Sequence, residues 1–268
     1  MRFGVCTAIS NASMLKAAGW DFVEESVQRF LQPEVAESEW QGENLAREAG
    51  LPVEAANVLM PGGLKITGPA VDFAALRKHI GTVMMRAGRV GIKTVVFGSG
   101  GARNVPEGFD RERARGQILD FVRMAAEAAG ANGVVVVVEP LRRGECNILN
   151  SVAEAMGYVR EVSHPALECL VDSYHFWEEN EPLESLKEAM PRIRHVHVAD
   201  RGTRLAPGQT AAAAGQGDEG MAEYLGFFRV LKAGGYDGRI SVEGTWKPEL
   251  AADAGPVLGR LKEIWAKA

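Results

Sequence analysis

Short runs of β-forming residues alternate with amphipathic helical segments along the whole chain, and this alternation limits the fold more than any other feature. Several of the eight runs are continuous apolar stretches, as expected for parallel strands that helices cover on both faces. The predicted strands are Arg2–Thr7, Asp21–Glu24, Val53–Leu59, Thr94–Ser99, Val134–Glu139, Leu167–Asp172, Ile193–Val198 and Arg239–Gly244. Eight β-then-α units in a row predict an α/β protein whose parallel strands close into a barrel.

The segments between these strands have the apolar spacing of helices with one buried face. In one of them, apolar residues stand at positions i, i+3, i+4 and i+7, and a glycine follows where the helix is expected to end. These residues are Ile118, Phe121, Val122, Ala125 and Gly130. A (β/α)8, or TIM, barrel commonly takes about 250 residues, so we expect residues 1–268 to form a single TIM barrel domain.

A doubly wound open sheet is the alternative arrangement of alternating strands and helices. Its dinucleotide-binding form carries a glycine-rich fingerprint directly after the first strand. The residues at that place, Cys6-Thr-Ala-Ile-Ser10, contain no glycine. The closed barrel is therefore favoured over the open sheet.

Composition and charge limit the kinds of binding partner and the cellular compartment that we expect. The formal net charge is −5 without a basic block, so we expect no nucleic-acid partner, because neutralising phosphates requires clustered Lys and Arg. Three widely spaced cysteines without a C-x-x-C pair indicate a reducing compartment. The first residues do not resemble a signal peptide, and the longest apolar run, Val134–Val138, is far too short to span a bilayer. We therefore expect a cytoplasmic protein without membrane contact.

Polar residues end four consecutive predicted strands. The active site of a (β/α)8 barrel lies at the carboxyl ends of its strands, and alternate residues of a strand share one face. The last residues on the inward faces of strands five to eight are Glu139, Asp172, His197 and Glu243. Because consecutive strands are neighbours in the barrel, we expect these four side chains to converge at its mouth.

This set of side chains favours a metal site. Three carboxylates packed together would repel one another and shift one another's pKa values, and a divalent cation removes that conflict. An oxygen-rich set with one imidazole suits Mn²⁺ first, with Mg²⁺, Co²⁺ and Zn²⁺ as further candidates, and does not resemble a thiolate zinc site. His195 shares a face with His197 but lies one layer deeper. We expect it to be a buried, hydrogen-bonded histidine and not a ligand.

Several other features leave two interpretations open. Gly98–Gly101 follows the fourth strand and is either a tight turn or a place where backbone approaches a ligand. Glu24 ends the second strand and either contacts substrate or is a structural carboxylate. The small-residue segment 202–220, with five glycines, is either a mobile lid over the site or a surface loop.

Four motifs resemble the xylose isomerase-like barrel superfamily, and most closely its sugar phosphate isomerase/epimerase branch, which includes the ketose 3-epimerases. They are Val-Val-Val-Glu139-Pro-Leu, Leu-Val-Asp172-Ser-Tyr-His175, His195-Val-His197-Val-Ala-Asp200 and Ile-Ser-Val-Glu243. Each motif alone is modest, but the ordered set is specific and the resemblance covers nearly the whole chain.

The resemblance implies a role for each matched metal ligand. The equivalents of Glu139 and Glu243 bind the metal and act as the acid/base pair, whereas those of Asp172 and His197 are ligands only. His175, three residues after the aspartate, corresponds to a histidine that contacts a substrate oxygen.

Two further positions correspond to substrate-binding residues of the epimerases. Glu145 matches a glutamate that usually follows an Asn-Arg pair, whereas this chain has Arg142-Arg143. Arg204 is the best match for an arginine that follows the histidine ligand. Its spacing is one residue longer than usual, so Arg201 stays open.

Together with these residues, the resemblance implies an isomerase or epimerase of a sugar, keto-sugar or polyol. A carboxylate would remove a proton next to a carbonyl that the metal polarises, forming an enediolate. A lyase of the inosose dehydratase kind and a non-catalytic sugar-binding barrel are the alternatives. A DNA-repair endonuclease of the superfamily fits poorly, because it uses several metals and more histidines than the five present here. The sequence leaves open the sugar, its phosphorylation and whether the chain forms a homo-oligomer.

Overall fold

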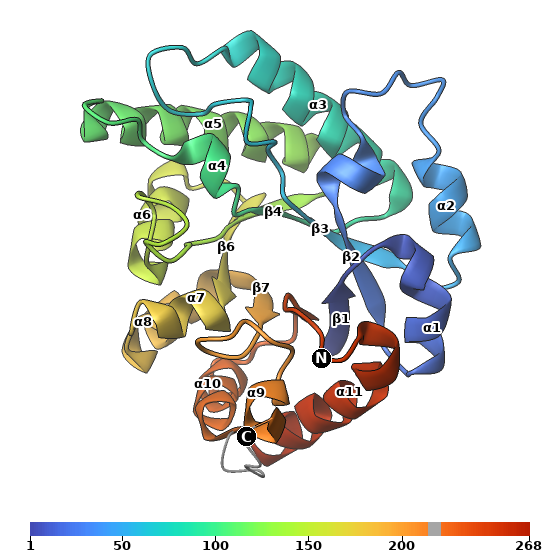
Figure 1. The fold of residues 1–268 in the computed structure, drawn as a ribbon. Coiled ribbons are helices and arrows are strands. Elements are labelled where there is room, and N and C mark those ends of the chain that lie inside the picture. The colour runs from blue at the N-terminus through green and yellow to red at the C-terminus, as the bar shows by residue number, and fades with distance from the viewer. Residues whose placement is uncertain (214–220) are drawn as a thin grey trace.

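The computed structural model describes residues 1–213 and 221–268, and its eight strands form one closed parallel barrel in sequence order (Figure 1). The predicted TIM barrel is therefore confirmed. The strands are β1 (Arg2–Cys6), β2 (Phe22–Ser26), β3 (Val53–Asn57), β4 (Thr94–Phe97), β5 (Val135–Val138), β6 (Leu167–Asp172), β7 (Ile193–Val198) and β8 (Arg239–Val242). The predicted boundaries differ from these by at most two residues.

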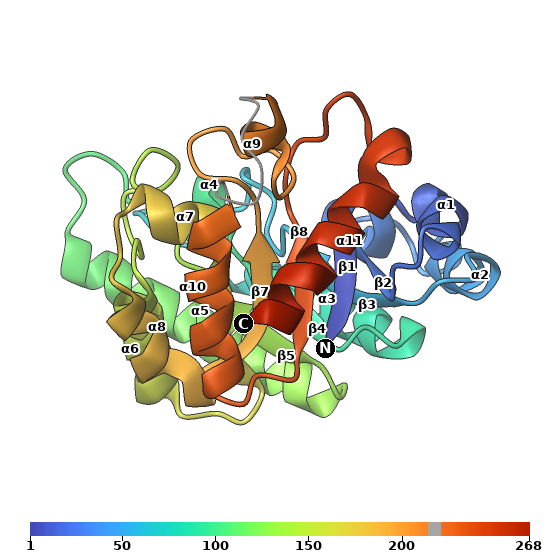
Figure 2. The same ribbon diagram turned by 90° about the horizontal axis from the view of Figure 1, so that it is seen from below.

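Helices surround the barrel and cover its outer face (Figure 1). They are α1 (Ala12–Ala17), α2 (Gly42–Glu48), α3 (Phe73–Val90), α4 (Gly100–Arg103), α5 (Arg111–Ala131), α6 (Val152–Val162), α7 (Ser173–Glu178), α8 (Leu183–Ala189), α9 (Gln209–Ala213), α10 (Ala222–Ala233) and α11 (Leu250–Lys267). Short irregular helical turns also occur at Ile9–Asn11, Val27–Leu31 and Met190–Arg192. Figure 2 shows α4, α7 and α9 at the same end of the barrel, the end towards which β7 points. This end carries the candidate site.

The long helices begin and end where side chains and glycines satisfy their free backbone groups. Asp72 accepts hydrogen bonds from the amides of Ala74 and Ala75 at the start of α3, and Gly91 ends this helix with a φ of 85°. The predicted apolar stripe of α5, which includes Ile118 and Phe121, is fully buried. The helices therefore bury one face against the sheet, as their sequence spacing indicates.

The parallel register sets the height of each candidate residue in the barrel. Asp172 pairs with His197, and His197 pairs with Ser241. His195 pairs with Leu170 and Arg239, one layer below the mouth. Below the site, Val96, Val137 and Leu170 fill the barrel interior as a small apolar cluster.

Glu139 and Glu243 lie directly after β5 and β8, although their backbone amides continue the strand ladder. The amide of Glu139 donates to the carbonyl of Phe97 at 3.1 Å, and that of Glu243 donates to the carbonyl of Val198 at 3.1 Å. The alternation of the strands therefore still governs where both side chains point. No helix in the part of the chain that the structure describes has the length and hydropathy needed to cross a membrane.

Candidate metal centre and active site

The four predicted ligands come together at the carboxyl end of the barrel. One ligand atom from each of Glu139, Asp172, His197 and Glu243 lies within 4.8 Å of the others. Nδ1 of His197 lies 3.2 Å from Oε1 of Glu139 and 3.5 Å from Oε2 of Glu243. Glu139, Asp172 and His197 are buried, and Glu243 is half-buried. The geometry therefore gathers three carboxylates and one imidazole nitrogen around a single point.

Asp172 provides an independent test of whether this group suits a cation. Its Oδ1 accepts a hydrogen bond from the amide of Tyr174 at 2.8 Å, at the start of α7. Its Oδ2 is buried and accepts no hydrogen bond within the described residues. Burying a carboxylate oxygen without a partner costs free energy that a bound cation would offset. The donor set and this free oxygen both fit a divalent metal.

The surroundings of Glu139 and Glu243 shift the pKa values of these two glutamates in opposite directions. Burial, together with the carboxylates of Glu243 and Asp172, raises the pKa of Glu139 above its ordinary value. Burial also acts to raise the pKa of Glu243, but His197 and Arg204 outweigh that effect and lower this pKa to about 2. Two carboxylates whose pKa values are driven apart can serve as a proton donor and a proton acceptor.

Arg204 reaches into the same group of carboxylates. Its Nη2 lies 2.7 Å from Oε2 of Glu243, and its Nη1 lies 3.1 Å from Oε1 of Glu145. A left-handed backbone, with a φ of 53°, aims the side chain there. The amide of Arg204 donates to the carbonyl of Asp200 at 2.9 Å, and the carbonyl of Arg204 accepts from the amide of Thr245 at 2.8 Å, so two backbone hydrogen bonds hold this conformation.

Arg201, the other arginine left open by the sequence, points elsewhere. Its guanidinium pairs with Glu223 at 3.2 Å and with the side-chain oxygen of Asn180 at 2.6 Å, and it is exposed. The structure therefore brings Arg204, and not Arg201, to the predicted ligands.

His175 and Glu145 lie beside the ligands at the rim of the site. His175 is buried, and its Nε2 lies 3.7 Å from Oδ2 of Asp172 and 3.9 Å from Oε2 of Glu145. Glu145 also pairs with Arg142 at 2.9 Å. All three predicted substrate-binding residues, including Arg204, thus surround the candidate metal centre.

Asn57 is a site residue that the sequence analysis missed. Its Nδ2 donates to Oε1 of Glu243 at 3.1 Å. It is the last residue of β3, so applying the strand-end rule to the third strand would have found it. Next to it, Val58 is exposed at the mouth in a left-handed backbone conformation with a φ of 55°, and Gln28 donates to its carbonyl at 2.9 Å.

The glycine turn after β4 has a reason that neither sequence interpretation included. A Cβ atom added to Gly98 would lie 1.9 Å from Oε2 of Glu139. Gly98 therefore makes room for the carboxylate of a candidate ligand. The next residue, Ser99, links the segments that follow β3 and β4, because its Oγ accepts a hydrogen bond from the amide of Met60 at 2.9 Å.

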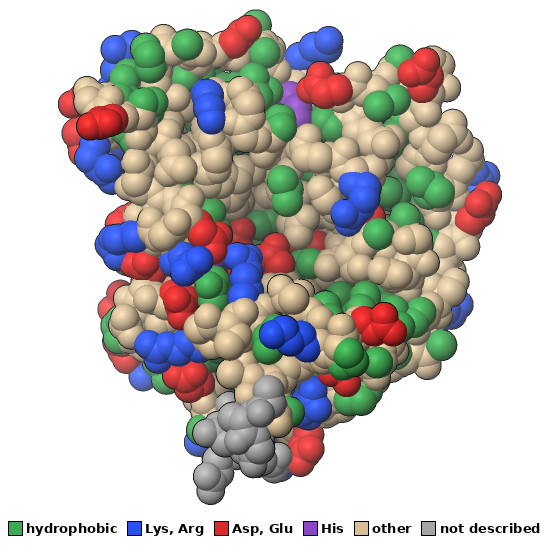
Figure 3. Space-filling view, viewed as in Figure 1, with side chains coloured by type: hydrophobic (Ala, Val, Ile, Leu, Met, Phe, Trp, Pro, Cys, Tyr) green, Lys and Arg blue, Asp and Glu red, His purple; other side chains and the backbone are tan. Residues whose placement is uncertain are grey.

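Two adjoining hollows open at the mouth of the barrel. Their volumes are about 640 and 380 Å³, and both are lined by Asn57, Val58, Arg204 and Glu243. Figure 3 shows acidic and basic side chains gathered in the hollow at the centre of this face. Sites of this size and polarity suit a small polar molecule.

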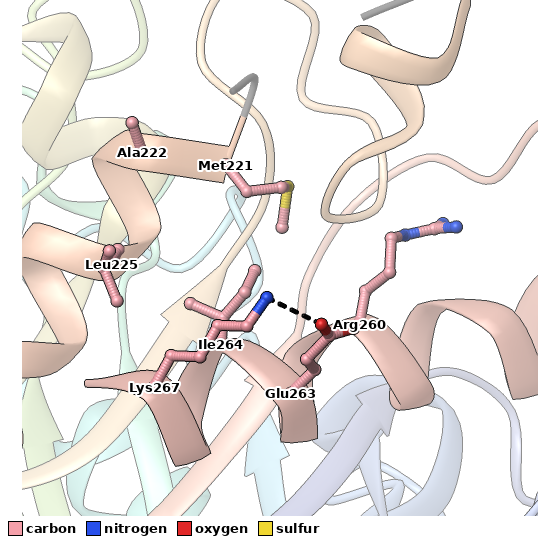
Figure 4. A pocket seen from close by; sticks show the side chains of 7 residues that line it. All are labelled: Met221, Ala222, Leu225, Arg260, Glu263, Ile264 and Lys267. Atoms are coloured by element: carbon pink, nitrogen blue, oxygen red, sulfur yellow. Dashed lines mark hydrogen bonds and ion pairs between the residues drawn. The ribbon is translucent and has the colours of Figure 1, made fainter. Parts of the chain in front are cut away.

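A separate cavity lies between α10 and α11 on the outside of the barrel (Figure 4). Met221, Leu225 and Ile264 give it an apolar wall, and an ion pair between Lys267 and Glu263 crosses its edge at 2.7 Å. None of the predicted site residues lines it. The predicted site residues therefore lie at the barrel mouth and not at this cavity.

The segment 202–220, considered as a lid, falls partly outside the described residues, which omit 214–220. Its first half is tied to the barrel. The carboxylate of Asp200 accepts hydrogen bonds from the amides of Gly208 and Thr210, both at 2.8 Å, and from the hydroxyl of Tyr224 at 3.0 Å. These hydrogen bonds hold the backbone of Gly208 and Thr210 against Asp200, just after β7.

A closed parallel barrel with three carboxylates and a histidine at its carboxyl end defines the class of this protein as a TIM barrel with a candidate metal centre. The chain belongs to the xylose isomerase-like TIM barrel family, whose model matches residues 13–264. It is 30% identical over 203 residues to the 2-oxo-tetronate isomerase of Cupriavidus necator, covering 73% of this chain and 71% of that protein.

Other relatives are also sugar isomerases and epimerases. The chain is 27% identical over 146 residues to the ketose 3-epimerase of Arthrobacter globiformis, covering 54% of this chain and 47% of that protein, so the match spans about half of that relative. The fold is similar to that of the D-psicose 3-epimerase with D-tagatose from Clostridium cellulolyticum H10, with a TM-score of 0.82, 16% identity and 99% of each chain covered.

Proposed function

We propose that this protein is a divalent-metal-dependent sugar isomerase or epimerase that moves a proton next to a carbonyl through an enediolate. The observation that carries the proposal is the convergence of Glu139, Asp172, His197 and Glu243 within 4.8 Å, with one oxygen of Asp172 left without a hydrogen bond. The activities of the relatives, an isomerase of a 2-oxo-tetronate and a ketose 3-epimerase, support the same reaction class.

The four converging residues would hold the metal, with Mn²⁺ as the first candidate because oxygen ligands dominate the set. When bound, the cation would polarise the substrate carbonyl and stabilise the negative charge that develops on its oxygen. The carboxylates would then no longer depend on Arg204 for neutralisation, so its guanidinium would be available to substrate oxygens.

The two glutamates would transfer the proton. His197 and Arg204 lower the pKa of Glu243 and so favour its ionised form, in which it would remove the proton from the carbon next to the carbonyl. Glu139, with its raised pKa, would carry a solvent-derived proton and donate it to the enediolate, and Glu243 would release the removed proton to solvent. His175, Glu145 and Arg204 would orient the sugar hydroxyls from the rim, since ionic and imidazole groups form directional hydrogen bonds to hydroxyl oxygens.

An isotope experiment separates this reaction from its alternatives. Turnover of a panel of keto-sugars and inososes with added Mn²⁺ in D₂O should give an isomer that carries deuterium at the reacting carbon. A dehydratase would give a product lighter by one water, and a sugar-binding barrel would give no product. Product without deuterium would indicate a hydride shift and would contradict the proposal.

A pair of variants tests whether Glu243 is the base that accepts the proton. Glu243→Gln should abolish both exchange and turnover, because an amide cannot accept the proton. Glu188→Gln, which changes an exposed carboxylate of α8 outside the site, should leave both unchanged. Full activity of the Glu243 variant would overturn the mechanism. The cytoplasmic location and the absence of nucleic-acid and membrane partners stay predictions from the sequence.

A further inference from the structure

Glu24 joins the two histidines of β7 beneath the candidate metal centre. The side chain is 0% exposed. Its Oε1 lies 2.9 Å from Nε2 of His197, and its Oε2 lies 2.7 Å from Nε2 of His195. Because β2 and β7 are separated by β8 and β1 in the closed sheet, the carboxylate reaches across the barrel interior to make both contacts.

These contacts set which nitrogen of His197 faces the candidate metal centre. An ionised carboxylate only accepts hydrogen bonds, so the proton between Glu24 and His197 belongs to Nε2. Nδ1 then faces the site, 3.2 Å from Glu139 and 3.5 Å from Glu243. A neutral imidazole protonated at Nε2 has its lone pair at Nδ1, on the side of the three carboxylates.

We propose that Glu24 is a positioning residue of the metal centre: it holds the Nε2–H of His197 and thereby presents Nδ1 to the cation. The inference rests on the proposed function, because it requires a metal at the four converging residues. A carboxylate behind a histidine ligand fixes the tautomer and orientation of the ring and increases its basicity.

The surroundings of Glu24 favour this role over direct contact with substrate. Glu24 lies along the wall of the larger hollow, but its side chain is 0% exposed and both of its oxygens already accept from imidazole nitrogens. Nε2 of His197 also contacts Sγ of Cys6, but at 4.0 Å the thiol is a much weaker partner than the carboxylate.

A matched control lies at the adjacent position of the same strand. Glu25 is 1% exposed, but its carboxylate accepts from the amides of Ile9 at 2.8 Å and Ser26 at 2.6 Å and pairs with Arg29 at 2.7 Å. Alternation along β2 therefore directs Glu25 away from the histidines. Neutralising Glu25 tests the general cost of losing a buried carboxylate in this strand.

The first test measures Mn²⁺ binding by calorimetry on metal-stripped protein. Glu24→Gln should weaken Mn²⁺ binding by about 10- to 100-fold, the usual effect of removing such a partner. Glu25→Gln should stay within about twofold of the wild-type protein. The Co²⁺ absorption spectrum should also shift in Glu24→Gln and not in Glu25→Gln, because a changed ligand orientation alters the coordination geometry. Equal Mn²⁺ affinity of Glu24→Gln and the wild-type protein would overturn the role of Glu24.

The second test needs no variant. In Zn²⁺-loaded, ¹⁵N-histidine-labelled wild-type protein, long-range ¹H–¹⁵N spectra should place the remaining ring proton of His197 on Nε2. A proton on Nδ1 would overturn the inference. Wild-type protein that binds none of the tested metals would contradict the proposed function itself, so the two failures are distinguishable.

Discussion

The guanidinium of Arg204 lies 2.7 Å from the carboxylate of Glu243, at the point where the candidate ligands converge. The same side chain lies 3.1 Å from Glu145 and 4.0 Å from Oδ2 of Asp172. In the metal-free protein, this one cation therefore offsets the repulsion among several carboxylates. A divalent metal would take over that task.

Arg204→Gln should consequently make folding more dependent on metal. We expect the metal-free variant to lose about 1 to 3 kcal/mol of unfolding free energy, because it leaves partly buried carboxylates without their cation. Saturating Mn²⁺ should restore most of this loss, so calorimetry should show a larger metal-induced rise in Tm than for wild type. Arg201→Gln, at the exposed arginine nearby, is the control. Equal metal-induced rises for wild type and Arg204→Gln would contradict the prediction.

The two histidines of β7 should differ in their effect on metal binding. His197→Ala removes a candidate ligand, so we expect the Mn²⁺ dissociation constant to rise by more than about a hundredfold. His195→Ala removes only a partner of Glu24, so the rise should stay within the roughly tenfold to hundredfold range of indirect contacts. Binding titrations on both variants check the order. If His195→Ala releases the metal more readily, the assignment of the two layers is wrong.

The barrel and the candidate ligands could be predicted because both follow from local rules. Alternation along each strand identifies the last inward residue, as at Asp172 and His197, without knowledge of any contact. The deeper position of His195 also follows from alternation, and its predicted burial and hydrogen bonding are confirmed by its contact with Glu24. Predicted strands such as Val53–Leu59 extend too far, because the apolar residues Val58 and Leu59 continue past Asn57, where β3 ends.

The remaining features depend on contacts between distant segments. Glu24 and His197 are 173 positions apart, and neither strand alone indicates that they meet. Arg204 reaches the site through a left-handed turn, which spacing could not distinguish from Arg201. The need for glycine at position 98 is set by the side chain of Glu139, so a turn motif could not reveal it.

Glu181 should make stability depend on pH. Its carboxylate accepts from the amide of Val152 at the start of α6, and burial raises its pKa to about 7. The folded protein therefore holds this proton more tightly than the unfolded chain. Its stabilising contribution is complete below about pH 4.5 and is lost as the pH rises through 7.

The comparison of wild type with Glu181→Gln isolates this effect. Because Glu181 keeps partial contact with water, we expect wild type to lose about 1 to 2 kcal/mol relative to the variant between pH 4.5 and 8. Urea unfolding across this range measures the difference. Glu184→Gln changes an exposed carboxylate of α8, and its unfolding free energy should change with pH as that of wild type does. A constant difference between wild type and Glu181→Gln would show that Glu181 does not titrate in this window.

Gly98→Ala should damage the metal centre while leaving the barrel folded. The new methyl group would occupy the place of Oε2 of Glu139, 1.9 Å away, and the flexible end of that glutamate can move to relieve the clash. We therefore expect a change of unfolding free energy below about 1 kcal/mol. Mn²⁺ affinity should fall by at least about tenfold and turnover should fall with it, because a displaced ligand or proton donor no longer meets the required geometry.

Gly101→Ala is the matched control for this prediction. A Cβ atom added to Gly101 would lie 3.5 Å from Cα of Gly62, which is an ordinary contact distance. Gly98 lies directly after β4 and Gly101 lies three positions later in α4, and both substitutions add the same methyl group, so a general effect of adding a methyl group to this segment would appear in both variants. Only the displacement of Glu139 distinguishes them. Equal Mn²⁺ affinities for Gly98→Ala and Gly101→Ala would therefore show that the space beside Glu139 is not what requires glycine at position 98.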